Sequence, residues 1–154
     1  MKYKILAISA LFAGFAAMAQ AQTSGQFSIS CGQITVEQQI TATSTISTFP
    51  CTTNATINGV AFTGLTFSAA GQMDATVANV WGVIVGTLTN GSAVYFEYHT
   101  SYTRRNGVDS IPVLTYKIVG GTGTANGISG SGTCKVASTP TGAEDSCVGN
   151  YAIR

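Results

Sequence analysis

The chain has 154 residues, and its charged fraction of 8% is about a third of the value usual for a soluble domain. The chain has seven basic and six acidic residues, and apart from Arg104-Arg105 its cations are scattered, which excludes a surface built to bind nucleic acid. Thr, Ser, Gly, Asn and Gln supply most of the polarity, as they do in many exported β-proteins.

The first residues have the pattern of a secretory signal peptide. Lys2 and Lys4 precede an apolar run over residues 5–17, and small residues follow. A bilayer span needs about 20 apolar residues, so we expect a cleaved signal rather than an anchor. Cleavage after Ala19 or after Ala21 fits the small-residue rule. We favour the second site because the residues after it are polar.

Removal of this leader defines the mature protein. Residues 1–21 are the predicted signal peptide, and residues 22–154 form one domain of about 130 residues. The mature chain keeps five basic and six acidic residues, a net charge of −1. We expect a periplasmic or secreted protein with no membrane span after signal removal.

Four cysteines, an even number, enter this oxidising compartment, so disulfides are expected. Three pairings are open, and we favour Cys31 with Cys51 and Cys134 with Cys147, because each pair brackets a short, turn-rich segment. A four-cysteine zinc site is the alternative, but its ligands normally come as close C-x(2 to 4)-C pairs. We therefore predict no metal and no cofactor.

Alternation with period two dominates the mature chain, and no long window has a helical period with caps, so we expect an all-β protein. The predicted strands are Gln26 to Cys31, Ile34 to Ala42, Thr56 to Phe67, Met73 to Val77, Val80 to Thr89, Ala93 to Tyr102, Pro112 to Val119, Ile128 to Ala137 and Cys147 to Ile153. The Thr-rich stretch of residues 41–56 is expected to be an exposed strand and loop, pinned by Cys51.

Three dipeptides between these strands are typical of type I′ hairpin turns, namely Asn58-Gly59, Asn90-Gly91 and Asn106-Gly107. The strands should therefore pair as antiparallel neighbours. A small closed barrel of about eight strands fits better than an open sheet, whose edges invite aggregation. A two-sheet β-sandwich is the alternative.

The strand over residues 94–102 has the densest set of reactive side chains. Alternation places Tyr95, Glu97 and His99 on one face, and the set with Phe96 and Tyr98 on the other. If the first face lines a lumen, His99 with Glu97 and Tyr95 could act as general acid or base, and these three are the candidate catalytic residues. If that face meets solvent, it is an ordinary outer face and the aromatic set is core.

Candidate ligand-binding residues lie on and beside this strand. Arg104 and Arg105 follow it, and an arginine pair at a barrel mouth can hold a carboxylate in bidentate fashion. A solvated turn is the alternative explanation for them. Trp81 and Tyr98 are the candidate aromatic contacts to a ligand.

The segment from Tyr116 to Cys134 contains six glycines between two strand-like runs, which predicts a tightly bent β-ribbon. Glycines within residues 120–123, 127 and 130–132 resemble the GGTG-x(3)-G-x(2)-G-x-G signature of allene oxide cyclase-like and dirigent-like barrel proteins. Residues 116–119 and 147–151 resemble the flanking strands of that family, and residues 81–87 are similar to a central strand. The resemblance covers the second half of the chain.

This resemblance implies an eight-stranded antiparallel barrel, often oligomeric, whose mouth or lumen holds an apolar ligand. Characterised relatives cyclise an unstable intermediate or guide radical coupling. No catalytic residue carries over, because the matching positions are glycines.

Three functional interpretations follow. The leading one is an exported barrel that binds a small apolar or aromatic molecule without turning it over. The second is a cyclase or isomerase of the allene oxide cyclase-like kind, which requires Tyr95, Glu97 and His99 to point inward. The third is a structural subunit of fimbrial type, which would explain the Thr-rich strands and an early disulfide.

Overall fold

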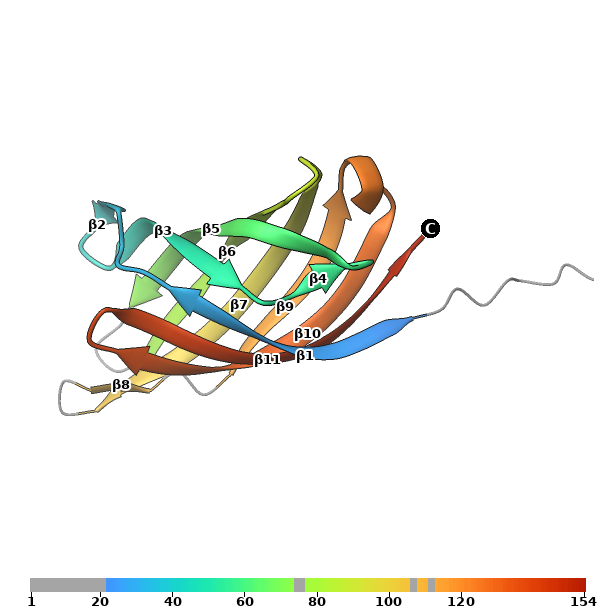
Figure 1. Ribbon diagram of the computed structural model, residues 1–154. Coiled ribbons are helices and arrows are strands. Elements are labelled where there is room, and N and C mark those ends of the chain that lie inside the picture. Colours follow the sequence, from blue (N-terminus) through green and yellow to red (C-terminus); the bar gives the residue numbers. More distant parts are fainter. Residues whose placement is uncertain (1–21, 74–76, 106–107, 111–112) are drawn as a thin grey trace, which may run out of the picture.

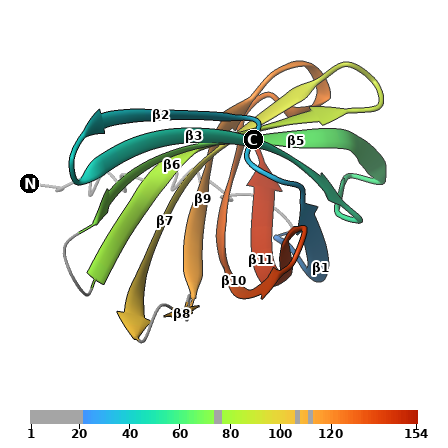
Figure 2. The ribbon, with the colours of Figure 1, turned by 90° about the vertical axis from the view of Figure 1, so that its left-hand side faces the viewer.

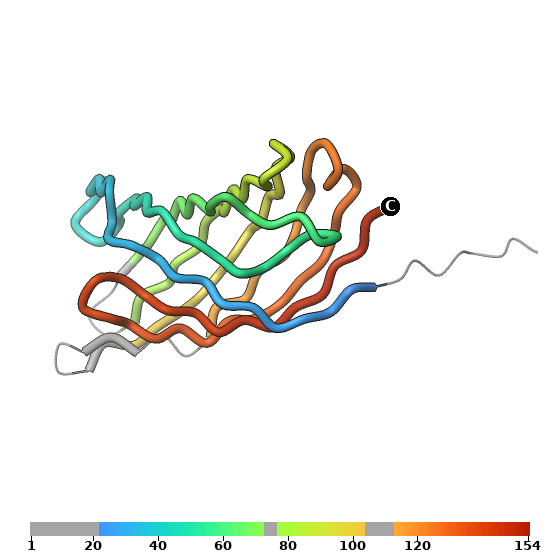
Figure 3. Tube along the Cα trace, in the orientation of Figure 1, coloured from blue at the N-terminus to red at the C-terminus, as the bar shows by residue number. Residues whose placement is uncertain are grey.

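The structure is a computed structural model that describes residues 22–73, 77–105, 108–110 and 113–154 (Figures 1 and 3). The predicted signal peptide lies outside the described residues. The elements are β1 (Thr23–Cys31), β2 (Val36–Thr41), β3 (Ser44–Thr53), β4 (Thr56–Ile57), β5 (Val60–Met73), β6 (Val77–Leu88), β7 (Ala93–Arg105), β8 (Val108–Ser110), β9 (Leu114–Gly121), the 3-10 helix η1 (Gly123–Ala125), β10 (Ile128–Thr139) and β11 (Gly142–Ile153).

Eight strands form a closed antiparallel barrel in the order β3-β1-β11-β10-β9-β7-β6-β5 (Figure 2). The pairing of β3 with β5, from Ser44–Gln72 to Cys51–Leu65, closes the ring. Strands β2, β4 and β8 lie outside it and pair with β3, β5 and β7 respectively. The prediction of a barrel of about eight strands is confirmed, and the sandwich alternative is not adopted.

Alternation along the strands separates an inner face from an outer one. On β7, Val94 and Tyr98 are buried, whereas Tyr95 and Glu97 between them are exposed. Aliphatic and aromatic side chains make up most of the buried interior, and Leu88 among them is 1% exposed. The core of the protein is therefore apolar and lies inside the ring of strands.

Both favoured disulfides are present. Cys31 on β1 bonds to Cys51 on β3, and Cys134 on β10 bonds to Cys147 on β11. Each bridge joins two residues that lie directly opposite each other in the strand register and are buried in the core. The described cysteines are thus all used in disulfides, which suits an oxidising compartment.

The three Asn-Gly dipeptides have different outcomes. Asn58 and Gly59 both have positive φ, 49° and 78°, so this turn between β4 and β5 has the predicted type I′ character. At Asn90-Gly91 only Gly91 has positive φ, at 83°. The Gly91 N–H donates to the Leu88 carbonyl at 2.9 Å, which makes a type I turn with a bulge, so the I′ prediction is wrong here. Asn106-Gly107 lies outside the described residues.

Strand boundaries differ from the prediction mainly in the first half. The Thr-rich stretch is more than an exposed strand and loop, because it supplies β3, which closes the ring. The predicted strand Thr56 to Phe67 is split by the turn at Asn58, and β5 continues to Met73. The short strand predicted from Met73 to Val77 spans residues 74–76, which lie outside the described residues.

Candidate functional site

A cavity of about 440 Å³ lies at one end of the barrel interior. The first half of β1, the segment between β3 and β5, and the last residues of β11 surround it. In Figure 1 this is the end of the barrel at which the C-terminus lies. The volume is within the range of about 300 to 1,000 Å³ that small-molecule sites usually have.

Six aromatic side chains from five strands line the cavity: Phe27 on β1, Phe62 and Phe67 on β5, Phe96 on β7, Tyr116 on β9 and Tyr151 on β11. The ring centroids of Phe27 and Phe96 lie 6.1 and 6.0 Å from that of Tyr116, both in edge-on geometry. Aromatic pairs at these distances stabilise one another and hold their rings in place. The aliphatic part of the lining is Ile29, Ile57, Leu65, Ile84, Leu114 and Ile118.

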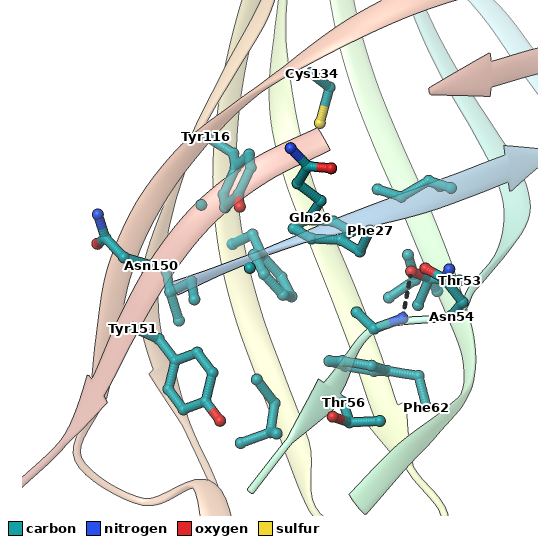
Figure 4. Close-up of a pocket in the computed structure, with 18 of the residues that line it drawn as sticks. Gln26, Phe27, Thr53, Asn54, Thr56, Phe62, Tyr116, Cys134, Asn150 and Tyr151 are labelled. Carbon is teal, nitrogen blue, oxygen red and sulfur yellow. Dashed lines mark hydrogen bonds between the residues drawn. The ribbon is translucent and has the colours of Figure 1, made fainter. Parts of the chain in front are cut away.

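Polar side chains lie on two sides of the cavity, where Figure 4 shows Tyr151 on one side and Thr53, Asn54 and Thr56 on the other. Gln26 and Asn150 alternate with the inward Phe27 and Tyr151 and therefore belong to the outer face. The Tyr151 hydroxyl accepts the backbone N–H of Asn58 at 2.8 Å and donates to Asn58 Oδ1 at 3.3 Å. This pair ties the end of β11 to the turn between β4 and β5. The Tyr151 hydroxyl and the polar side chains of the segment between β3 and β4 offer a ligand neutral donors and acceptors at the rim of the cavity.

The segment between β3 and β4 is held against β1 by its own side chains. The Ser28 backbone N–H donates to Asn54 Oδ1 at 2.8 Å, and Thr53 Oγ1 donates to the Ser28 carbonyl at 2.7 Å. The same hydroxyl accepts the Ala55 N–H at 3.1 Å, the dashed line in Figure 4. This wall of the cavity is therefore fixed before a ligand arrives.

None of the described residues that line the cavity is Asp, Glu, Lys, Arg or His. Tyr116 is the most deeply placed titratable side chain of the lining, and burial raises its pKa to about 12. Its hydroxyl thus stays protonated at neutral pH and acts as a neutral hydrogen-bonding group. Such a lining suits an uncharged molecule, because a charged one would lose its hydration without gaining an opposite charge.

Two glycines make room for Tyr116. A Cβ at Gly132 on β10 or at Gly149 on β11 would collide with the Tyr116 hydroxyl. Glycine is needed at both positions because the tyrosine hydroxyl packs directly against their backbones. Part of the glycine density of the second half thus fixes the position of one cavity side chain.

Replacing Gly149 with Ala should displace Tyr116 and lower the free energy of unfolding by about 1 to 3 kcal/mol, the usual cost of overpacking. Chemical denaturation measures the change. Gly25→Ala is a matched control, because Gly25 also lines the cavity, pairs with Gly149 across β1 and β11, and has nothing within 4 Å of a built Cβ. Equal stabilities of the two variants would contradict the close packing.

The predicted catalytic residues lie elsewhere. Tyr95, Glu97 and His99 are exposed on the outer face of β7, where Glu97 is opposite Lys117 of β9 and His99 is opposite Trp81 of β6. None of these residues lines the cavity. The structure thus adopts the second of the two interpretations given for residues 94–102, in which this face meets solvent and the aromatic set belongs to the core.

The predicted ligand contacts are also outside the cavity. Trp81 is 46% exposed on the outer wall, and Tyr98 is buried in the core beside Phe67, with ring centroids 5.4 Å apart. Burial raises the pKa of the Tyr98 hydroxyl far above its usual value. Arg104 and Arg105 belong to the end of β7, but their side chains are not described.

Sequence reasoning missed most of the lining because it comes from the first half of the chain. Phe27, Phe62 and Asn54 lie in strands and turns with no recognisable motif, and only the register of a closed barrel brings them to Tyr116. The alternation of apolar residues was a usable signal for Phe27 and Phe96, since both are flanked by polar neighbours.

Among the residues that the structure describes, no group of three or more His, Cys, Asp and Glu could hold a metal ion. In the same part of the chain, no helix is both long and apolar enough to cross a membrane.

Comparison of the structure with solved structures places the fold. The pterocarpan synthase dirigent protein GePTS1 aligns over 97% of this chain and 98% of its own, with a TM-score of 0.53 and 16% identity. This chain has the fold of a dirigent-like barrel. A protein of unknown function from the DUF3224 family of Shewanella oneidensis aligns over 88% of this chain and 98% of its own, with a TM-score of 0.44 and 11% identity. No protein family and no curated protein matched the sequence.

Proposed function

We propose that this chain is an exported binding protein whose barrel holds one small, uncharged, apolar or aromatic molecule. The observation that carries the proposal is the cavity of about 440 Å³ with aromatic rings in its wall, neutral polar groups at its rim and no charged residue in its described lining. The dirigent-like fold and the two disulfides support it. The signal pattern of residues 1–21 supports export.

Binding without turnover is favoured over cyclase activity of the allene oxide cyclase-like kind. The residues assigned to that chemistry, Tyr95, Glu97 and His99, are on the outer face. Within the described lining, only the hydroxyls and amides remain as hydrogen-bonding side chains. These groups can orient a ligand, and Tyr116 is a weak acid because of its raised pKa.

Native mass spectrometry of the protein from its exported fraction tests the proposal. We expect a reproducible extra mass of one small neutral compound per chain. Incubation with the recovered compound should return it chemically unchanged; a product of altered structure would support the enzyme interpretation instead.

A blocking variant locates the site. In Gly25→Trp the new side chain enters the cavity from a position with no atom within 4 Å of its Cβ, so we expect folding to persist and affinity to fall at least tenfold. Gly120→Trp is the control, because Gly120 is equally open and lies outside the lining. Titration calorimetry with the recovered compound measures both. Unchanged affinity in Gly25→Trp would place the ligand elsewhere.

A further inference from the structure

Strand β2 is a sheet edge that lies outside the closed ring. It pairs only with β3, over Val36–Thr48 to Thr41–Ser44, and all six of its residues are exposed. β1 pairs with the same edge of β3, but only from Ile29–Thr53 to Cys31–Cys51. Beyond Cys51 this edge of β3 is paired with β2. Figure 2 shows β2 along β3 with no strand on its other side. The backbone groups on that side have no partner within the described sheet.

This edge has little of the protection that natural edge strands usually have. Such strands normally use Lys, Pro or inward-pointing charges to prevent pairing with other chains. The sequence of β2 is VEQQIT, with Glu37 as its one charge. Four exposed apolar side chains lie on or next to this strand. They are Ile34, Val36, Ile40 and Ile46, with exposed fractions of 52%, 59%, 52% and 45%. An unprotected edge beside apolar residues is typical of a pairing surface.

We propose that β2 pairs in antiparallel fashion with β2 of a second copy of this chain, about a two-fold axis at Gln38. A two-fold pair of identical strands allows only registers in which one residue lies opposite itself. An axis at Glu37 would set two carboxylates face to face, which is unfavourable. An axis at Gln39 would put Val36 beyond the last paired residue, Thr41.

The axis at Gln38 satisfies both requirements. It sets Val36 opposite Ile40 of the second copy and Glu37 opposite the Gln39 amide, so apolar residues meet each other and the carboxylate meets a donor. Residues directly opposite in an antiparallel pair have Cβ atoms about 4.5 to 5.5 Å apart, close enough for these contacts. The bulge between Gln39 and Thr41 lies beside the Val36–Ile40 pair, near each end of the shared ladder.

The neighbouring strands leave room for this second strand. In the proposed register the paired segment of the second copy ends with Thr41, which lies opposite Thr35. The pairing therefore stops before Cys31, where Gly142 at the start of β11 packs against the Cys31 carbonyl. The net charge of −1 expected for the mature chain gives little repulsion between copies. In Figure 1 β2 is at the opposite end of the barrel from the C-terminus, so pairing leaves the ligand cavity open.

A charge-swap experiment at Gln38 tests this register. Native mass spectrometry and sedimentation velocity of the wild-type protein at low ionic strength should show a concentration-dependent dimer. Gln38→Glu or Gln38→Lys alone places like charges opposite each other, and each should weaken the dimer at least tenfold. An equimolar mixture of the two variants should restore it as a heterodimer. Thr133→Glu and Thr133→Lys, on exposed β10 positions, are controls that should leave the dimer unchanged.

The remaining outcomes overturn the proposal. A wild-type protein that stays monomeric shows that β2 does not pair. A dimer that survives both Gln38 variants shows that another surface, such as the outer wall around Trp81, joins the copies. A mixture that fails to restore the dimer after both variants weaken it shows that Gln38 does not lie on the axis.

Discussion

Reduction of both disulfides is expected to lower the free energy of unfolding by about 3 kcal/mol for each bridge, because each closes a loop in the unfolded chain. The sequence separation is 20 for Cys31 and Cys51 and 13 for Cys134 and Cys147. A domain of this size has a total stability of about 5 to 15 kcal/mol, so the reduced protein should be near the limit of folding. The melting temperature with and without a reductant measures the effect.

The bridge between Cys31 and Cys51 should be the more important one for barrel closure. β1 and β3 share only three register pairs, and this disulfide is at the last of them, whereas β10 and β11 pair along their whole length. The double variant Cys31→Ala with Cys51→Ala should therefore raise hydrogen exchange along β1 and β3 first. The double variant Cys134→Ala with Cys147→Ala is the matched comparison. If reduced and oxidised proteins melt alike, the disulfides do not stabilise the barrel.

Replacing Asp145 with Asn is expected to raise stability at pH 7 by up to about 3 kcal/mol. Asp145 is 4% exposed on β11, opposite Ile29 of β1 and Val136 of β10, and its Oδ1 has no hydrogen-bond partner. Desolvation first, and the charge of Glu144 second, raise the pKa of this carboxyl from 3.8 to about 6. Asn has nearly the same shape without the buried charge, although its amide also needs partners.

The raised pKa sets the sign of the pH dependence. The folded state binds the proton of Asp145 more tightly than the unfolded state, so with respect to this group the wild-type protein is most stable below about pH 4. It loses stability as the pH rises from about 4 to about 6, and above that range the loss is complete. A shift of about two units corresponds to about 3 kcal/mol. In Asp145→Asn this loss should disappear.

Chemical denaturation at pH 4, 5, 6 and 7 tests both statements. Glu144→Gln is the control: Glu144 is exposed on the outer face, where it accepts the Ser30 Oγ–H at 2.6 Å, and its removal should shift the profile only slightly. A wild-type profile that is flat in this range, or an Asp145→Asn variant that is less stable than wild type at pH 7, would contradict the buried, unpaired carboxylate.

Local signals predicted the local parts of this fold well. The disulfide pairs follow from short spacing, the turn at Asn58 follows from its dipeptide, and most strands of the second half follow from alternation. The ring closure by β3 could not be read in this way. Thr-rich strands and Thr-rich loops look alike in a sequence, and only the pairing of β3 with β5 and β1 distinguishes them.

The candidate site was harder to predict for a related reason. A period of two separates the two faces of β7 but does not say which face is inside. The face with Glu97 and His99 has the more reactive side chains, yet the barrel turns the other face inward, where Tyr98 is buried and Phe96 is partly buried against the core. Burying Glu97 and His99 without partners would have cost far more than burying two aromatic rings. This difference in cost could have predicted that the face with Phe96 and Tyr98 lies inside the barrel.

The exposed position of Trp81 has a practical consequence for spectroscopy. It is the one tryptophan of the sequence, and it lies on the outer wall rather than in the cavity. Its emission will therefore report on solvent and on contacts made by the outer surface, while filling of the cavity leaves it largely unchanged. Ligand titrations need calorimetry, mass spectrometry or the ultraviolet absorption of Tyr116 instead.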